Sequence, residues 1–239
     1  MSSLESLTRL PDDFDGLVRL FPLPGVVTFP HVMQPLHIFE PRYCDMLTDA
    51  LSSNRLLAMA TLARGWEVDY EGRPAIENLA CIGRIVSHTP TDDDRHNILL
   101  LGIRRVRILK EITTNQTYRM AQVEVLDDVY SPESEADRPS LKRLLLEEFR
   151  NYIPDSALAQ ESFSQLLDSQ MPLGVVSDII SYTVGISTAT KLRLLAELNV
   201  DQRARLLIEA LNHSSPAQSD SSIQGDSLTP GFPPPFSLN

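Results

Sequence analysis

The sequence has few cysteines, and this limits the chemistry that it can support. Its 239 residues include only two, Cys44 and Cys81. They fall in different predicted elements, with no C-x-x-C motif and no ladder of histidines beside them. A chain of this length buries roughly 70% of its unfolded surface and needs no disulfide or metal to hold it together. We therefore expect two reduced thiols, no metal site and no cofactor.

The sequence also lacks a long apolar run. Its N-terminus, MSSLESLTRLPDDFDG, does not have the charged segment followed by an apolar segment that is typical of a secretory signal. No uninterrupted apolar stretch approaches the ~18 residues that a membrane-spanning helix needs. These two absences predict a cytoplasmic protein with no membrane contact.

Positive charge is scarce and unevenly distributed. The formal net charge is −11, and residues 151–190 contain no lysine or arginine. Asp155, Glu161 and Asp178 lie within that segment. This half of the molecule would repel a polyanion, so nucleic-acid binding is disfavoured.

The hydrophobic period changes near residue 128. Between residues 17 and 128, apolar residues occur in the alternating or β-branched runs that are typical of strands. The six runs are LVRLFPL, VMQPLHIF, LLAMATL, ACIGRIVSH, NILLLGIRRVRILKEI and YRMAQVEVL. Short turns rich in Gly, Pro, Asn and Asp separate them. This pattern predicts a closed or nearly closed small β-barrel over residues 17–128.

One helix is predicted within this β region, in EPRYCDMLTDALSSN. Pro41 suits the first helical turn. The apolar residues that follow share one helical face: Tyr43, Met46, Leu47, Ala50 and Leu51. We expect this helix to lie across one end of the barrel.

Beyond residue 128 the spacing of apolar residues becomes that of helices. An acidic, proline-flanked linker, residues 129–138, precedes a bundle of about five helices over residues 139–212. Gly185 is predicted as a C-terminal cap, and Ser187 and Asp201 as N-caps. Residues 1–16 are predicted to be flexible and residues 213–239 disordered, because both are polar or rich in Ser, Pro and Gly. The predicted fold class is α+β.

Three segments, in this order, resemble the N-terminal substrate-recognition domain of Lon, the ATP-dependent protease. They are FPLPGVVTFPHVMQPLHIFEPRY, then LLGIRRVRILKEI with YRMAQVEVLDD, and ISYTVGISTATKLRLLAELNVDQRARLLIEAL. The resemblance covers residues 17–212. It implies a PUA-like β subdomain followed by a helical subdomain, which agrees with the change of period.

In full-length Lon this domain is followed by an AAA+ ATPase and a Ser-Lys protease. None of the ten glycines stands in a GxxxxGK[ST] arrangement, whose backbone N–H groups would hold phosphates. We therefore interpret the chain as a stand-alone Lon-type domain that keeps recognition and lacks both catalytic parts. It is expected not to be an enzyme.

Each pattern that suggests catalysis has a simpler interpretation. Ser187 and Lys191 have the spacing of a Ser-Lys dyad, but an N-cap serine with a solvated lysine explains both. His31 and His37 could join Cys44 in a nucleophilic or metal site. However, no carboxylate is spaced to orient either ring, and His37 alternates as an outward-facing strand residue would.

Two charged clusters remain. The acidic cluster, Asp92–Asp94, lacks the 12-residue pattern of an EF-hand and is interpreted as a solvated hairpin tip. The basic cluster consists of Arg104, Arg105, Arg107 and Lys110. Strand alternation would split it between two faces, which weakens the case for a phosphate-binding stripe.

The stretch from residue 20 to residue 43 contains five prolines among apolar residues. Proline pre-sets backbone shape, so an apolar loop can stay exposed and loses less entropy when it binds a partner. The candidate protein-contact residues are Val27, Phe29, Met33, Glu40 and Arg42. In the alternative interpretation, the apolar members of this set seal the barrel against the helix.

The sequence thus predicts a non-catalytic module that binds unfolded or apolar protein segments. In its adaptor form it would deliver these clients to a protease or a chaperone. Two alternatives stay open: an RNA-binding PUA-like protein, and a small-molecule sensor that uses a cleft between the two subdomains.

Overall fold

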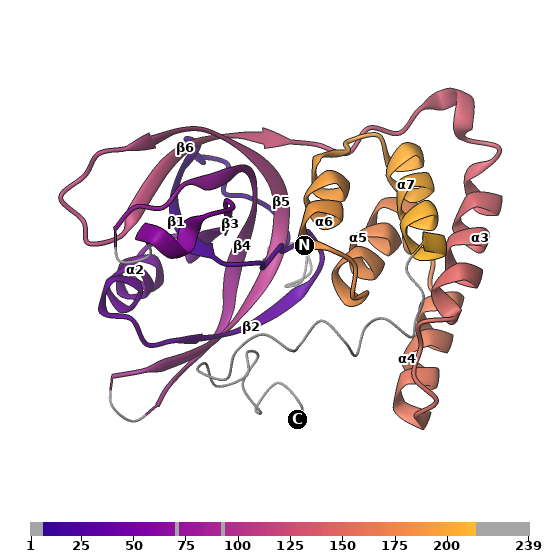
Figure 1. Cartoon of the computed structure of the whole chain (residues 1–239), viewed down its shortest axis with the longest axis horizontal. Helices are drawn as coiled ribbons and strands as arrows, with labels where there is room; N and C mark the ends of the chain where they lie inside the picture. The colour runs from indigo at the N-terminus through magenta and orange to yellow at the C-terminus, as the bar shows by residue number, and fades with distance from the viewer. Residues whose placement is uncertain (1–6, 70–71, 92–93, 214–239) are drawn as a thin grey trace. The chain divides into compact units, whose positions relative to one another are not determined.

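A computed structural model describes residues 7–69, 72–91 and 94–213 of the chain (Figure 1). The described residues form two compact units that divide between Leu126 and Asp127. The first contains six strands and helix α2, and the second contains five α-helices. This arrangement confirms the predicted α+β fold class. The predicted disordered tail, residues 213–239, lies outside the described residues from residue 214 onward.

The first unit is built on a six-stranded mixed sheet. Its strands are β1 (Leu17–Leu23), β2 (Met33–Ile38), β3 (Leu56–Leu62), β4 (Ile76–Pro90), β5 (His96–Ile112) and β6 (Arg119–Leu126). Their order in the sheet is β2-β5-β4-β3-β1-β6. Strands β1 and β3 run parallel, and the other pairs are antiparallel. Each of the six apolar runs in the sequence supplies one of these strands.

Strand β5 curls the sheet back on itself (Figure 1). It pairs with β2 through its first part, with β6 through its last part, and with β4 along most of its 17 residues. Within the described ranges, β2 pairs with β5 alone, so the sheet keeps a free edge there. The β5–β6 pairing thus brings the sheet round on itself as a nearly closed barrel predicts, while β2 stays at an edge and the barrel is not fully closed.

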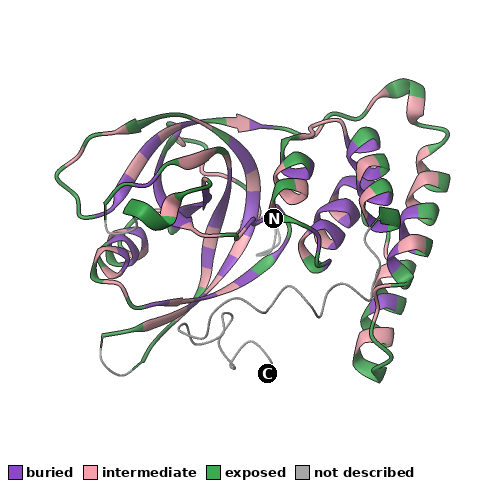
Figure 2. Ribbon diagram, viewed as in Figure 1, coloured by how far each residue is buried: buried purple, intermediate pink, exposed green. Residues whose placement is uncertain are grey.

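Helix α2 (Pro41–Leu51) covers part of the sheet, as the apolar spacing predicts. Its buried residues Tyr43, Met46, Leu47 and Ala50 belong to a core cluster with Leu36, Ile38, Ile98 and Leu100 from β2 and β5. Even-numbered positions of β2 therefore face the core. Strand β3 is buried along its whole length, which explains why its sequence is apolar without alternation (Figure 2).

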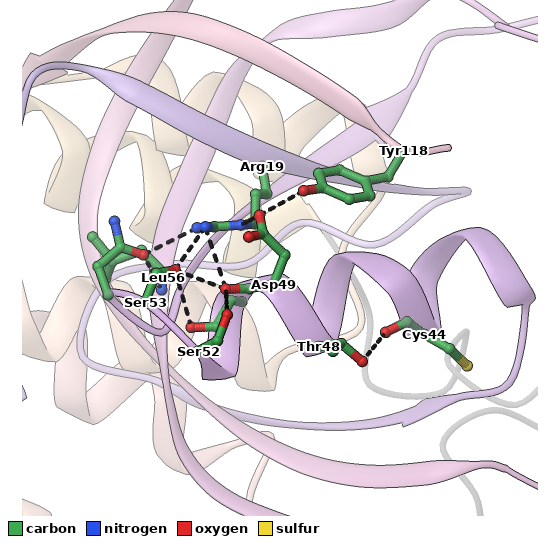
Figure 3. Close-up of polar contacts among 10 residues, drawn as sticks. Arg19, Cys44, Thr48, Asp49, Ser52, Ser53, Leu56 and Tyr118 are labelled. Atoms are coloured by element: carbon green, nitrogen blue, oxygen red, sulfur yellow. Dashed lines mark hydrogen bonds and ion pairs between the residues drawn. The ribbon is translucent and has the colours of Figure 1, made fainter. Parts of the chain in front are cut away.

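A polar network anchors the C-terminal part of α2 to the sheet (Figure 3). Asp49 accepts hydrogen bonds from Arg19 Nε, at 2.6 Å, and from the Tyr118 hydroxyl, at 2.5 Å. Arg19 also donates to Ser53 Oγ and Asn54 Oδ1. The hydrogen bond from Arg19 lowers the pKa of Asp49 below its ordinary value. Burial, helped by the bond to Asp49, raises the pKa of Tyr118 to about 12.

These shifts predict an acid-sensitive contribution to stability. Because the pKa of Asp49 is depressed in the folded state, its contribution is present above the ordinary carboxyl value of 3.8 and is lost as pH falls through the folded pKa. We expect Asp49→Asn to flatten the acid limb of the curve of unfolding free energy against pH. Urea unfolding from about pH 2 to pH 7 measures this. Asp45→Asn, on the same helix, is the control, and an unchanged acid limb in Asp49→Asn would contradict the assignment.

Residues 7–16 contact the sheet, so the expectation of a flexible segment needs correction for them. Leu10 and Phe14 pack against the second core cluster of the first unit. Arg84 donates hydrogen bonds to the backbone carbonyls of Leu7 and Arg9. The sequence predicts polarity here, but two apolar side chains and a strand arginine hold the segment in place.

The second unit is a helical bundle. Its helices are α3 (Arg138–Arg150), α4 (Ala157–Asp168), α5 (Leu173–Thr183), α6 (Thr188–Ala196) and α7 (Val200–His213). Helix α7 packs against α3, α5 and α6. Helix α4 is mostly exposed, with Phe163 as its buried side chain (Figure 2). The described residues thus hold the five helices that the sequence predicts.

The caps of these helices match the predictions in one case out of three. Ser187 caps α6, as predicted, by accepting the N–H of Thr190. At the start of α7, Asn199 Oδ1 accepts the N–H groups of Asp201 and Gln202, so Asn199 is the cap in place of Asp201. Helix α5 ends at Thr183 with an extended residue after it, and Gly185 does not adopt the left-handed conformation of a C-terminal cap.

Buried ion pairs tie the linker to this bundle. Arg203 on α7 is 0% exposed and donates two hydrogen bonds to the Asp128 carboxylate, at 2.9 and 2.6 Å. Its Nε lies 3.5 Å from the fully buried Asp178 of α5. Arg138, at the start of α3, pairs in the same way with Asp201. The predicted linker, residues 129–138, is therefore held at both ends.

Candidate protein-contact surface

The clearest exposed apolar surface of the first unit is the outer face of β2. Met33 is 44% exposed, and Pro35 and His37 are partly exposed. Their cross-strand partners on β5 are Leu101, Leu99 and Asn97. Directly opposed residues share one face of a sheet, so the partly exposed Leu99 and Leu101 extend this surface. We call Met33, Pro35, His37, Leu99 and Leu101 the β2 outer face.

Phe39 enlarges this surface at the end of β2. Its side chain is 58% exposed, and its ring stacks on His37 with the centroids 5.8 Å apart. His37 Nδ1 lies 2.7 Å from Asn97 Oδ1, which fixes the imidazole against the strand. The result is a row of apolar and aromatic groups along a free sheet edge, which is the kind of surface that extended polypeptides bind.

Two predicted contact residues do not belong to this surface. Val27 is 4% exposed and Phe29 is 0% exposed, so the expectation that they are exposed is wrong. For these two residues the alternative interpretation, in which they seal the sheet, holds. Met33 is the predicted apolar contact residue that lies on the exposed face.

The backbone explains why Val27 and Phe29 are buried. Gly102 of β5 approaches this segment so closely that an added Cβ would lie 2.0 Å from the Phe29 carbonyl oxygen. Gly102 also bonds to the segment in both directions, by accepting the N–H of His31 and donating its own N–H to the Val32 carbonyl. Thr61 Oγ1 donates to the Val26 carbonyl at 2.7 Å. The loop is therefore fixed against two strands.

The polar candidates, Glu40 and Arg42, lie at the start of α2. They form an ion pair at 2.8 Å, and the Arg42 guanidinium lies 4.8 Å from the Tyr43 ring centroid. Both side chains are partly exposed, at 22% for Glu40 and 25% for Arg42. Glu40 follows Phe39 directly in the chain, and Arg42 lines a small pocket that is described below.

The sequence contains a signal for the exposed neighbours of Met33 that the predicted contact set does not include. If His37 faces outward, then period-two spacing places Met33, Pro35 and Phe39 on the same side. The contribution of Leu99 and Leu101 is harder to find, because it depends on the register between β2 and β5. That register is not readable from one strand alone.

The second unit offers a separate groove between α3 and α4, with a volume of about 400 Å³. Its apolar lining comes from Leu146, Phe163 and Leu167. Lys142, Arg143 and Arg150 line it with positive charge, and Glu147 adds one carboxylate. Lys142 is engaged, since it donates to the carbonyls of Ser169 and Met171.

The patterns that suggested catalysis do not assemble into a catalytic site. Ser187 Oγ lies 2.9 Å from Thr190 Oγ1, whereas Lys191 Nζ donates to the Tyr182 carbonyl. Burial lowers the pKa of Lys191, but the amine does not face the serine hydroxyl. Cys44 and Cys81 are both free thiols, and Cys44 is partly exposed.

The possible metal site and the two charged clusters of the sequence can be judged in the same way. Within the described ranges, no three His, Cys, Asp or Glu side chains are grouped closely enough to hold a metal ion. Asp92 and Asp93 lie outside those ranges. In the basic cluster Arg105 is buried and Arg107 pairs with Glu124 at 2.6 Å, so these arginines do not form an exposed stripe.

No helix in the described part of the chain is both long and apolar enough to cross a membrane.

A rolled mixed sheet followed by a helical bundle is the fold of solved Lon N-terminal domains. The N-terminal domain of the Mycobacterium avium complex Lon protease matches with a TM-score of 0.63 and 17% identity, over 82% of this chain and 98% of that one. The crystal structure of the Lon N-terminal domain protein from Xanthomonas campestris matches with a TM-score of 0.55 and 22% identity, over 81% and 97%. At these identities the likeness concerns the fold.

The sequence comparison defines the family. Residues 18–213 match the model of the ATP-dependent protease La (LON) substrate-binding domain, and the chain belongs to this family. It is 27% identical over 194 residues to the Lon protease of Heliobacterium modesticaldum, covering 80% of this chain and 23% of that protein. The Lon protease of Anaeromyxobacter dehalogenans is 24% identical over 206 residues, covering 84% and 24%. The chain therefore spans about a quarter of the length of these relatives.

Proposed function

We propose that this protein is a non-catalytic recognition module that binds unfolded or apolar protein segments through the β2 outer face and Phe39. The observation that carries the proposal is the exposure of Met33 and Phe39 beside the free edge of β2. Membership of a substrate-binding family supports protein as the ligand class. A cytoplasmic location and an adaptor role, in which the bound client is passed to a protease or chaperone, are part of the same proposal.

The chemistry of the face suits clients of varied sequence. Methionine is flexible and polarisable, so Met33 can adapt to different apolar groups. Phe39 offers a large apolar area at low entropy cost. The rigid backbone behind them, with Leu36 and Ile38 in the core, means that little ordering entropy is lost on binding.

An edge strand also provides a geometric reason for selecting unfolded clients. An extended segment can lie along β2 with its alternate side chains directed at the outer face, whereas a folded client has few free extended segments. Pro35 has no N–H and so removes one donor from this edge. This limits uncontrolled sheet growth between copies of the chain.

The proposal predicts that Met33→Ser combined with Phe39→Ser weakens client binding by about tenfold or more, because losing apolar anchors typically costs above about 1 kcal/mol each. The unfolding free energy should change by less than about 0.5 kcal/mol per site, since both side chains are exposed. Fluorescence anisotropy with a labelled, reduced and alkylated protein that cannot refold measures the affinity.

A matched control removes apolar groups that are at least as exposed, elsewhere on the first unit. Leu109 is 57% exposed and Val68 is 93% exposed, and neither belongs to the β2 outer face. The double change Leu109→Ser with Val68→Ser should leave client affinity unchanged. Equal loss in both double variants would show that general surface apolarity, and not this face, binds the client.

A further inference from the structure

A small pocket of about 150 Å³ lies in the first unit beside the start of α2. Three arginines line it: Arg42, Arg73 and Arg119. Among the residues that the structure describes, the rest of the lining is uncharged, although Arg42 is paired with Glu40 and Arg119 with Glu111 outside the lining. The described lining is therefore basic, in a chain whose formal net charge is −11.

Arg119 is the fixed element of this pocket. It is 8% exposed, and Nε and Nη2 donate to the two carboxylate oxygens of Glu111. Its Nη1 donates to the Pro74 carbonyl at 2.8 Å. These bonds use three of the five N–H groups of a guanidinium, and within the described ranges the other two have no partner. The group is therefore held in one orientation with donor capacity to spare.

The uncharged polar side chains of the lining are engaged elsewhere, since the Thr117 hydroxyl donates to Asp45 Oδ2 at 2.7 Å. The hydroxyl of Tyr118 is engaged by Asp49. Arg42 is held beside the pocket by Glu40 and by the ring of Tyr43. Arg73 is exposed and contributes from the chain segment that precedes β4.

We propose that this pocket binds a carboxylate of the protein client, supplied by the client's C-terminus or by an Asp or Glu side chain. Guanidinium groups match a carboxylate in planar geometry and form charge-assisted hydrogen bonds with it. The volume is below the ~300 Å³ typical of sites for larger organic ligands, and it suits a single residue. Arg42 lies three positions after Phe39, so one pocket arginine and one residue of the apolar surface belong to the same stretch of chain. The inference rests on the proposed function and adds a charged anchor to it.

Three peptides with one common apolar sequence test this inference on the full chain. The first has a free C-terminal carboxylate, the second is amidated, and the third is amidated but carries a terminal Asp side chain. Hydrogen bonds to charged groups are strong enough that the free acid should bind about tenfold or more tightly than the amide. The Asp peptide separates the two carboxylate sources: affinity equal to the free acid means that either source is accepted, and affinity equal to the amide restricts the site to a C-terminus.

Arg73→Glu is the variant of choice, because Arg73 is exposed and its loss does not disturb the core. It should abolish the difference between free acid and amide while the amide binds as before. Lys110→Glu makes the same change of charge at an exposed position of β5 outside the pocket lining and should keep the difference. Isotope-labelled protein gives a readout that does not depend on client binding: N-acetyl-leucine, and not its amide, should shift the Arg119 Nε–H resonance.

The outcomes separate this inference from the proposed function. If all peptides bind equally well and N-acetyl-leucine causes no shift, the carboxylate pocket is wrong and apolar recognition survives. A free-acid preference that persists in Arg73→Glu also overturns the assignment, because the carboxylate is then bound elsewhere. If no peptide binds but N-acetyl-leucine shifts Arg119, the pocket binds carboxylates without serving clients, and the inference as stated is overturned together with the proposed function.

Discussion

Replacing Arg203 with methionine should lower the unfolding free energy of the second unit by about 3 to 5 kcal/mol, the typical loss when one partner of a buried ion pair is removed. Arg203 and Asp178 are both 0% exposed, so the variant leaves a carboxylate buried without its cation. The variant also removes two hydrogen bonds from Asp128, the residue directly before the linker. The effect is therefore expected to exceed that of an ordinary surface change several-fold.

Urea unfolding followed by far-ultraviolet circular dichroism measures this loss, because the second unit contributes five of the α-helices. The single tryptophan, Trp66, lies in the first unit, and its fluorescence reports separately on that unit. Arg205→Met, at an exposed position on the same helix, is the matched control and should cost less than about 0.5 kcal/mol.

A second variant tests the cause. If the buried charge of Asp178 is responsible, then adding Asp178→Asn to Arg203→Met should recover part of the loss, because an amide tolerates burial better than an unpaired carboxylate. A loss below about 1 kcal/mol in Arg203→Met, or no recovery in the double variant, would assign the cluster a minor role.

The order of elements could be predicted because it depends on local periodicity. Runs such as LLAMATL and NILLLGIRRVRILKEI are long enough to specify strands, and the 3.6-residue spacing after the linker specifies helices. The capping residues show where local information ends. Ser187 caps α6 through a local hydrogen bond from the N–H of Thr190, whereas the carboxylate of Asp201 is bound by Arg138, a distant residue in the sequence, and Asn199 takes its place as cap.

The sites were less predictable because they depend on register and on the approach of distant strands. The sequence predicts that His37 faces outward, and period-two spacing then implies that Met33 and Phe39 are exposed. The pocket arginines come from three separate segments, and Arg42 is the one among them that the sequence predicts as a contact residue. Such groupings arise when the sheet rolls, which a linear pattern of alternation does not encode.

The loop before β2 shows the same limit and leads to the second large prediction. Phe29 looks like an exposed anchor in a proline-rich loop, yet it is 0% exposed, and its carbonyl lies against Gly102. We expect Phe29→Ala to lower the unfolding free energy of the first unit by about 3 to 5 kcal/mol, the usual range for removing a buried aromatic ring. Trp66 fluorescence during urea unfolding measures this, and circular dichroism of the helical unit should change little.

Met33→Ala is the matched control, since it lies four positions later on the same stretch and is 44% exposed. It should cost less than about 0.5 kcal/mol of stability while weakening client binding by about fivefold or more, the converse of Phe29→Ala. Assayed well below its lowered unfolding midpoint, Phe29→Ala should bind the client with an affinity close to that of the unmodified chain, because the β2 outer face is intact. If Phe29→Ala instead keeps full stability and loses client binding, Phe29 is exposed in solution, and the contact surface extends from β2 into the proline-rich loop.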